Sequence, residues 1–396
     1  MDKLYKTSEE SWNSFQKDFR VSWGLEDVYI KPTSLTYIDG EKGELRYLGY
    51  GIQDIISANA LAEEMQYAFI YGELPSREEL RHFVDVIEEG YDLPEHVIAA
   101  ITSLPSSSDV VAMQASAMAS LAAVSDFSWP QENKGDFFAR MLGQMSAITA
   151  VSIRHSVRQK PRLPSPGKAY AESFLEALLG KSPGDEKVRA MNNSLILYMD
   201  HEVPASTTAG IVTASTLADP YSAVLSALAA LRGPLHGGAT EVAMSQFLEI
   251  SDPRSVDAWI QDNIITGKRR LMGFGHRVYK TYDPRALIFK SMAVKLASDK
   301  SNARLLSIAL RLEEAGSQAL QKKGIYPNAD FYSPIVFSCI GIPFVKGSYT
   351  AVFALSRLPG WLAHFNEYLS LGGRIIRPRA IYVGHNERRF KPISER

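Results

Sequence analysis

The chain has 396 residues, more than one hydrophobic core usually supports, so we expect a large domain and a smaller one. Hydrophobic residues make up 45% and charged residues 22%, which is ordinary for a globular protein. The formal net charge is -1, so there is no broad basic field to neutralise a phosphate backbone, and we expect no nucleic-acid partner.

The chain contains one cysteine and therefore cannot form an internal disulfide. Cys339 lies in the apolar run Ile335–Ile340, which predicts a buried, inert thiol. Met1–Lys17 has no apolar segment of the secretory type, and no apolar stretch approaches the ~20 residues needed to cross a bilayer. We expect a cytoplasmic protein with no membrane partner.

The first predicted element is a short β-hairpin. Leu35–Ile38 and Leu45–Tyr47 are the best strand candidates, and Asp39–Gly43 between them is rich in turn residues. Strand signals are scarce elsewhere, and no alternation of strands with helices appears. The sequence therefore predicts an all-α fold with one hairpin near its N-terminus.

A helix is predicted immediately after Pro75. Ser76 and Glu79 have the spacing of a capping box, and Gly90 marks the end of the helix. Its apolar face is predicted at helical spacing by four residues: Leu80, Phe83, Val84 and Ile87.

Two further features follow along the chain. Pro161–Gly167 predicts a surface loop between helices. Tyr221–Leu231 predicts a buried helix, because large apolar residues occupy one side and alanines the other. Gly233-Pro234 ends this helix, and His236 follows directly.

Three of the eight histidines stand out by their surroundings: His201, His236 and His276. The last two lie among glycines, which allow a ligand to approach the backbone closely, and are predicted at helix boundaries. A set of three structural histidines is the alternative. The histidine spacing gives no support to a metal site, so none is predicted.

Arginines form a second group of candidates. Arg285, Arg357, Arg377 and Arg379 lie beside turns or at the ends of predicted elements. A guanidinium group binds a carboxylate in bidentate fashion and stays charged when buried, so this set suits a small polyanionic acid. Solvated surface charges are the alternative for each arginine taken alone.

Asp330 is the third candidate. Its apolar and aromatic neighbours predict a partly desolvated carboxylate, whose pKa would be raised and which would be a better base. A helix N-cap before Phe331–Ile340 explains the same residue equally well, and both interpretations can hold together.

Three motifs together resemble the citrate synthase family: Gly233-Pro234-Leu235-His236-Gly237-Gly238-Ala239, Gly273-Phe274-Gly275-His276-Arg277-Val278-Tyr279 and Pro327-Asn328-Ala329-Asp330-Phe331-Tyr332. Four shorter segments fit the same pattern: Ile38–Gly43, Tyr71–Pro75, Asp200-His201-Glu202 and Arg377-Pro378-Arg379. The resemblance runs from about Gly24 to Arg396. Thr240 departs from the usual asparagine, and Pro334 replaces a glycine and would stiffen a turn near Asp330.

The resemblance implies a two-domain helical fold and a homodimer. Residues 1–235 and 336–396 would form the large domain, and residues 236–335 the small domain. It also implies a reaction of the tricarboxylic acid cycle, in which acetyl-CoA condenses with oxaloacetate and the thioester is hydrolysed to give citrate and CoA. The CoA thioester is then a substrate, and no separate cofactor is expected.

The resemblance also assigns site residues. Asp330 would take the methyl proton, His236 would donate to the thioester oxygen, and His276 would polarise the oxaloacetate ketone. His201, Arg285 and Arg357 would hold the oxaloacetate carboxylates, with Arg377 reaching in from the partner subunit. The expected CoA contacts form a longer set: Met272, Gly273, Phe274, Gly275, Lys280 and Asn328.

Two alternative functions remain open at this point. One is 2-methylcitrate synthesis from propionyl-CoA, because the motifs are shared and one methylene gives little discrimination. The other is a non-catalytic sensor of di- or tricarboxylates, which would need the arginines but not Asp330.

Overall fold

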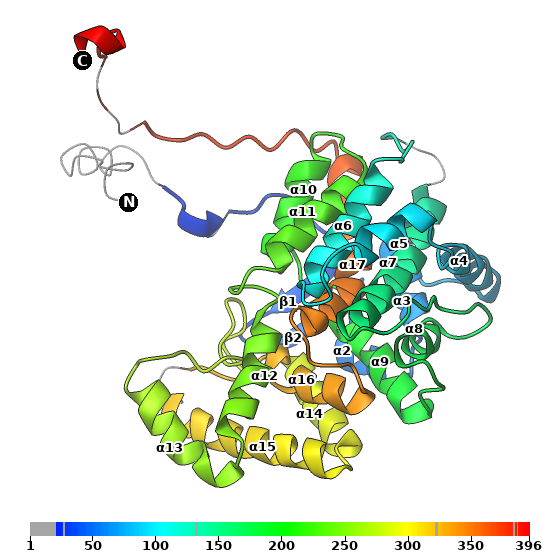
Figure 1. The fold of residues 1–396 in the computed structure, drawn as a ribbon, viewed down its shortest axis with the longest axis vertical. Helices are drawn as coiled ribbons and strands as arrows, with labels where there is room; N and C mark the ends of the chain where they lie inside the picture. The colour runs from blue at the N-terminus through cyan, green and yellow to red at the C-terminus, as the bar shows by residue number, and fades with distance from the viewer. Residues whose placement is uncertain (1–20, 27, 131–133, 321–323, 383–384, 386) are drawn as a thin grey trace. The chain divides into compact units, whose positions relative to one another are not determined.

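The computed structural model describes residues 21–26, 28–130, 134–320, 324–382, 385 and 387–396. Contacts divide the chain into two compact units, Thr33–Arg374 and a smaller one comprising Met1–Pro32 with Ile375–Arg396. The fold is all-α with one small sheet, as predicted, and the elements of the larger unit are arranged as in Figure 1.

The α-helices have the following bounds: α2 Ile52–Ser57, α3 Ala62–Tyr71, α4 Arg77–Glu89, α5 Glu95–Thr102, α6 Val110–Ala122, α7 Lys134–Ser156, α8 Tyr170–Leu179, α9 Asp185–Tyr198, α10 Ala205–Ala214, α11 Pro220–Leu231, α12 Ala239–Ile250, α13 Val256–Ile260, α14 Pro284–Leu296, α15 Lys300–Leu320, α16 Ala329–Ile340 and α17 Ser348–Ser370. Shorter turns of helix are Trp23–Leu25, Pro253–Ser255, Gln261–Ile265 and Ile393–Glu395.

The predicted hairpin is confirmed and gains a third strand. β1 (Thr36–Asp39) pairs with β2 (Glu44–Tyr47), which pairs with β3 (Tyr50–Gly51), all antiparallel. A Cβ on Gly40, in the β1–β2 turn, would lie 2.2 Å from the Val278 carbonyl oxygen. Only glycine therefore lets this turn contact the segment that follows His276.

The capping box of α4 is confirmed, because Ser76 and Glu79 bond reciprocally across the first turn. The buried face consists of Phe83, Val86 and Ile87, so it is rotated slightly from the predicted one. It contacts α7 at Gly143, where a Cβ would lie 1.9 Å from the Ile87 carbonyl oxygen. The close approach of the two helices requires this glycine.

Helix α17 is the buried centre of the larger unit, and Figure 1 shows it enclosed by α6, α7, α10 and α11. Trp361 and Arg357 are among its fully buried side chains. Gln114 of α6 donates both to Thr149 of α7 and to the Ala351 carbonyl of α17. The predicted buried helix at Tyr221–Leu231 is confirmed as α11.

Helices α12 to α16 gather at one end of the larger unit (Figure 1). Large and small domains with bounds at 235 and 335 remain a prediction. Cys339 is buried in α16, as predicted, and burial raises the pKa of its thiol to about 11. Pro334 lies inside α16 and not in a turn. In the part of the chain that is described, no helix is long and apolar enough to span a membrane.

Candidate active site

His236 lies in the turn between α11 and α12 and is held by Ser206 of α10. The Ser206 backbone N–H points at His236 Nε2 over 3.3 Å, and the Ser206 hydroxyl lies 2.8 Å from the same nitrogen. An N–H can only donate, so Nε2 accepts and the ring proton sits on Nδ1. Burial, reinforced by the Arg357 guanidinium, lowers the pKa of His236 to about 4. The imidazole is therefore neutral near pH 7, and its Nδ1–H can serve as a donor.

His276 lies in an irregular segment and not at a helix boundary, so the prediction of its setting was wrong. Its Nδ1 accepts from the backbone N–H groups of Val278 and Tyr279, at 3.0 and 3.2 Å. The ring proton is therefore on Nε2. Burial, followed by the charge on Arg285, lowers the pKa of His276 to about 4. This imidazole is also a neutral donor.

His201 lies beside His276, with ring centroids 4.9 Å apart. It lies shortly after the end of α9 and is buried, with Nε2 3.3 Å from the Tyr279 hydroxyl. Burial, with Arg285 and His276 nearby, lowers its pKa well below the usual range. His201 is thus available as an uncharged hydrogen-bonding group.

Arg285 opens α14 and is almost fully buried against Asp283. The guanidinium donates twice to this carboxylate, at 3.1 and 2.8 Å. Asp283 also accepts from the backbone N–H of Arg285 at the start of α14 and from that of Ala329 at the start of α16. One carboxylate therefore fixes an arginine and the N-termini of two helices.

Arg357 is buried in α17 and donates from Nε to the Tyr198 carbonyl oxygen at 2.7 Å. Its guanidinium lies 4.7 Å from the centre of the Phe353 ring. Its terminal nitrogens form no hydrogen bond within the described part of the chain. They are therefore free to bind an anionic group.

Asp330 lies in the first turn of α16 and does not cap it. Asn328 is the cap, because its side chain accepts from the Asp330 backbone N–H. The capping interpretation of Asp330 was therefore wrong. Its Oδ1 accepts from the hydroxyls of Tyr198 and Thr240, at 2.9 and 2.8 Å. Burial raises the pKa of Asp330.

These side chains come together in the larger unit. Arg285 is close enough to influence His201, His276 and Asp330 electrostatically. Phe353 links His236 to Tyr198, because the centroid of its ring lies 6.5 Å from that of His236 and 4.3 Å from that of Tyr198. The three sequence candidates for catalysis therefore belong to one cluster with two buried guanidinium groups.

Arg377 and Arg379 belong to the other unit, with Ile375–Arg396, and both are exposed there. The partner-subunit role of Arg377 remains a prediction.

The predicted CoA segment lies beside α16. Gly273 and Gly275 have positive φ angles of 79° and 84°, and a Cβ on Gly273 would lie 2.7 Å from the Phe331 Cα. Asn328 holds this segment through its side chain, which donates to the Gly275 carbonyl at 2.7 Å. Both the amide nitrogen and the amide oxygen of Asn328 therefore form hydrogen bonds within the protein.

The remaining members of that set are Met272, Phe274 and Lys280. Gln246 bonds both backbone groups of Met272, and the Phe274 ring packs edge-on against Phe331. The Lys280 side chain is exposed. The CoA roles of these residues remain predictions.

Sequence reasoning missed Asp283 and Tyr198 as members of the cluster. Asp283 had a usable signal, because Asp-Pro followed by Arg is typical of a helix start. Tyr198 had none, since it lies on the last turn of an ordinary amphipathic helix.

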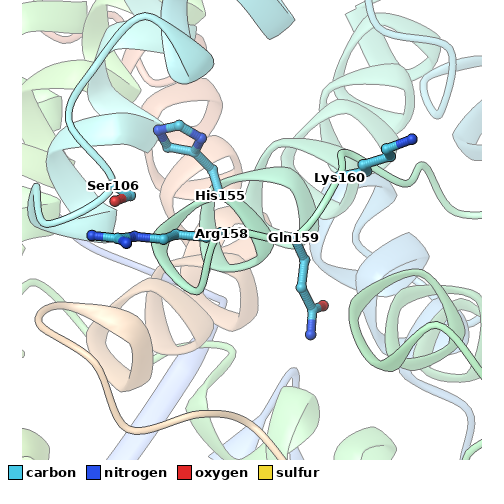
Figure 2. Close-up of a pocket in the computed structure, with 5 residues that line it drawn as sticks. All are labelled: Ser106, His155, Arg158, Gln159 and Lys160. Atoms are coloured by element: carbon cyan, nitrogen blue, oxygen red, sulfur yellow. The ribbon is translucent and has the colours of Figure 1, made fainter.

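A surface pocket of about 410 Å³ lies at the end of α7 and shares no residue with the cluster. Figure 2 shows its lining residues, with Lys160 and Gln159 directed away from Ser106 and Arg158. The side chains do not converge on a common point. Within the described residues, no group of three His, Cys, Asp or Glu side chains could hold a metal ion.

The fold and the cluster define an all-α enzyme with acid–base groups beside buried cations. The family model "Citrate synthase, C-terminal domain" matches residues 24–379. The chain belongs to the citrate synthase family, and it is an enzyme of the citrate synthase type.

Individual relatives match this chain over nearly their whole length. Citrate synthase of Thermoplasma acidophilum is 55% identical over 378 residues, covering 95% of this chain and 98% of that protein. Citrate synthase of Saccharolobus solfataricus is 47% identical, covering 95% and 99%.

Two solved structures are also similar. The first is a ternary complex of carboxymethyl coenzyme A and oxaloacetate with citrate synthase from Thermoplasma acidophilum. Its TM-score is 0.93 and its sequence identity 55%, covering 95% of this chain and 100% of that chain. Citrate synthase from Pyrobaculum aerophilum has a TM-score of 0.88 and 36% identity, covering 95% of each chain.

Proposed function

We propose that Asp330, His236 and His276 carry out the reaction of this enzyme. It condenses acetyl-CoA with oxaloacetate and hydrolyses the resulting thioester, giving citrate and CoA. The observation that carries the assignment is the clustering of one carboxylate with two imidazoles that are both neutral donors. This combination suits a reaction in which a weak carbon acid loses a proton while an adjacent oxygen receives a hydrogen bond.

The first step forms the nucleophile. The thioester methyl group is far too weakly acidic for a carboxylate to produce a bare enolate. Asp330 takes a methyl proton while His236 donates from Nδ1 to the thioester oxygen, so that negative charge does not accumulate. The enol carbon then attacks the oxaloacetate ketone, whose oxygen accepts a hydrogen bond from His276 Nε2.

The later steps balance the reaction. A carbon–carbon bond forms, and the ketone oxygen takes the Nε2 proton of His276 to become the hydroxyl group of a citryl thioester, while the enol proton returns to His236. The proton that Asp330 took from the methyl group makes up for the one that His276 gave. Water then breaks the carbon–sulfur bond, releasing CoA as a thiol and leaving the third carboxylate of citrate. No oxidant or separate cofactor is needed, since the thioester is itself a substrate.

The oxaloacetate carboxylates would bind to Arg285, Arg357 and His201, with Arg377 supplied by the partner subunit. Two of these groups are buried guanidiniums, and neither terminal nitrogen of Arg357 is used in the described structure. Buried cations bind a dicarboxylate more strongly than solvated ones, because the charges are screened less.

CoA would lie along the segment of Met272, Gly273, Phe274 and Gly275, with Lys280 near a phosphate and Asn328 near the pantetheine arm. Positive φ angles at two glycines support a close approach of ligand to backbone. The exposed ammonium group of Lys280 suits a phosphate.

The working unit is proposed to be a homodimer formed through α6, α10 and α11, which lie side by side in Figure 1. None of these three helices contains an Asp, Glu, Lys or Arg residue. Val212 on α10 and Leu217 just after it are nevertheless 37% and 60% exposed. A charge-free face of this extent is typical of a surface covered by a second copy.

Val212→Lys should shift the protein from dimer to monomer. Burying an ammonium group in this face costs several kcal/mol, so we expect the dimer dissociation constant to rise by roughly 100-fold or more. Sedimentation velocity over a concentration series measures it. Leu310→Lys is the matched control, because Leu310 on α15 is equally exposed at 37%. A dimer that withstands Val212→Lys would place the interface elsewhere.

The acyl donor is tested by steady-state CoA release with oxaloacetate and either acetyl-CoA or propionyl-CoA. We expect kcat/KM to favour acetyl-CoA by about 10-fold or more, the usual effect of one methylene in a fitted pocket. Mass spectrometry identifies the product. The opposite preference would identify 2-methylcitrate synthesis as the function, and oxaloacetate binding without turnover of either thioester would identify a sensor.

We also propose that this enzyme acts in the cytoplasm, as part of the tricarboxylic acid cycle. The single cysteine supports a reducing compartment, because no internal disulfide can form.

A further inference from the structure

Asp330 has two carboxylate oxygens with different surroundings. Oδ1 accepts from the Tyr198 hydroxyl at 2.9 Å and from the Thr240 hydroxyl at 2.8 Å. Oδ2 accepts no hydrogen bond from any described residue, and it is not among the buried side-chain atoms that lack a partner. Oδ2 is therefore not fully shielded, while Oδ1 is held by two hydroxyl groups.

We propose that Tyr198 and Thr240 are positioning residues that hold Oδ1 of Asp330 as the non-reacting oxygen, so that Oδ2 alone removes the proton from the acyl-CoA. This inference rests on the proposed role of Asp330 as the base.

Tyr198 is fixed tightly enough for this role. It is only 1% exposed, its ring lies 4.3 Å from Phe353 and 5.2 Å from Phe289, and its hydroxyl is 2.7 Å from Ser333 Oγ. Burial raises the pKa of the Tyr198 hydroxyl well above its usual value, so this group stays protonated and donates to Asp330. The Ser333 hydroxyl is then the donor to Tyr198.

Both positioning residues also connect Asp330 to the rest of the site. The Tyr198 carbonyl holds Arg357 at 2.7 Å, so one residue orients both the base and a carboxylate-binding arginine. Thr240 is fully buried in the first turn of α12, four residues after His236. The relative placement of base and donor thus depends on a short, rigid stretch of backbone.

The two hydroxyls also tune the basicity of Asp330. Burial raises the pKa of Asp330, and the hydrogen bonds from Thr240 and Tyr198 lower it. The other charged groups facing it are Arg285, which lowers its pKa, and Asp283, which raises it. Hydrogen bonds to the ionised form keep Asp330 deprotonated at lower pH. Removing them should therefore raise its pKa and move the acid limb of the kcat profile to higher pH.

The experiment compares Tyr198→Phe, Thr240→Val and Thr240→Ser in the full-length enzyme between pH 5 and 9. For Tyr198→Phe and Thr240→Val, we expect kcat to fall about 10-fold and the acid limb to move upward by about one pH unit each. KM for oxaloacetate should change little in Thr240→Val. Thr240→Ser keeps the hydroxyl and should restore the wild-type profile, while Tyr37→Phe, at an exposed tyrosine of β1, is the matched control.

An unmoved acid limb in Thr240→Val would overturn the inference, even if kcat fell, because a purely structural role predicts that result. Equal profiles for Thr240→Val and Thr240→Ser would do the same. If Tyr198→Phe does not fold, the two Thr240 variants alone decide the question. Failure of the proposed base itself is recognised separately, because Asp330→Asn would then remain active.

Discussion

Asp330→Asn should lower kcat by roughly 10³-fold or more while leaving oxaloacetate binding nearly intact. The amide cannot take a proton from the acyl-CoA methyl group. Its carbonyl oxygen can still accept from Tyr198 and Thr240, so the local packing should survive. The change therefore removes the chemistry and keeps the shape of the site. CoA release measures kcat, and calorimetric titration with oxaloacetate measures binding.

Asp85→Asn, at an exposed carboxylate of α4, is the control for the loss of one negative charge. Turnover by Asp330→Asn within ten-fold of wild type would require another base. Loss of oxaloacetate binding together with turnover would instead assign Asp330 a structural role. Because the two measurements are independent, each result points to one cause.

Asp283→Ala should destabilise the enzyme by about 3–5 kcal/mol, the usual cost of leaving a buried charge without its partner. The substitution leaves Arg285, which is only 5% exposed, without its charge partner. It also removes the hydrogen bonds that Asp283 accepts from the N-termini of two helices. It should also weaken oxaloacetate binding, since Arg285 would lose its orientation. Urea unfolding followed by circular dichroism measures the free energy of unfolding.

Asp283→Asn provides a graded comparison. Its side-chain oxygen can keep one backbone hydrogen bond, but the amide lacks the charge that balances Arg285. We expect a loss of stability smaller than that of Asp283→Ala. Arg254, exposed and paired with Asp252 on the surface, offers the contrast: Asp252→Ala should lower the stability much less, because solvent screens an exposed ion pair. Equal losses at positions 252 and 283 would contradict a special role for the buried pair.

Much of the fold could be predicted from local sequence. The capping box at Ser76, the turn-rich stretch after Ile38 and the alanine-rich helix before Gly233 each follow from interactions between residues a few positions apart. Such interactions repeat in any fold and can be recognised without coordinates. The motifs around His236, His276 and Asp330 likewise indicated the family, because their order and spacing are specific as a set.

The detailed chemistry of the site could not be predicted in the same way. Asp330 was interpreted as a possible cap, yet Asn328 caps α16 and the Asp330 carboxylate accepts from Tyr198 instead. His276 was expected at a helix boundary, but it lies in an irregular segment, where two nearby backbone N–H groups donate to Nδ1 and fix its tautomer. In both cases the deciding partner is a backbone N–H or a distant hydroxyl, which no residue pattern marks.

The sequence by itself determined the helical class, the hairpin and the family, and it supplied the candidates for the reacting groups, because each depends on residue type and short-range spacing. The tertiary structure alone decided which oxygen of Asp330 is free, which nitrogen of each histidine carries the proton, and that Asp283 joins α14 to α16. Tyr198 and Asp330 are 132 residues apart in the chain, and Ser206 and His236 are 30 apart. Contacts at such separations depend on how whole helices pack, so their geometry exists only in the folded chain.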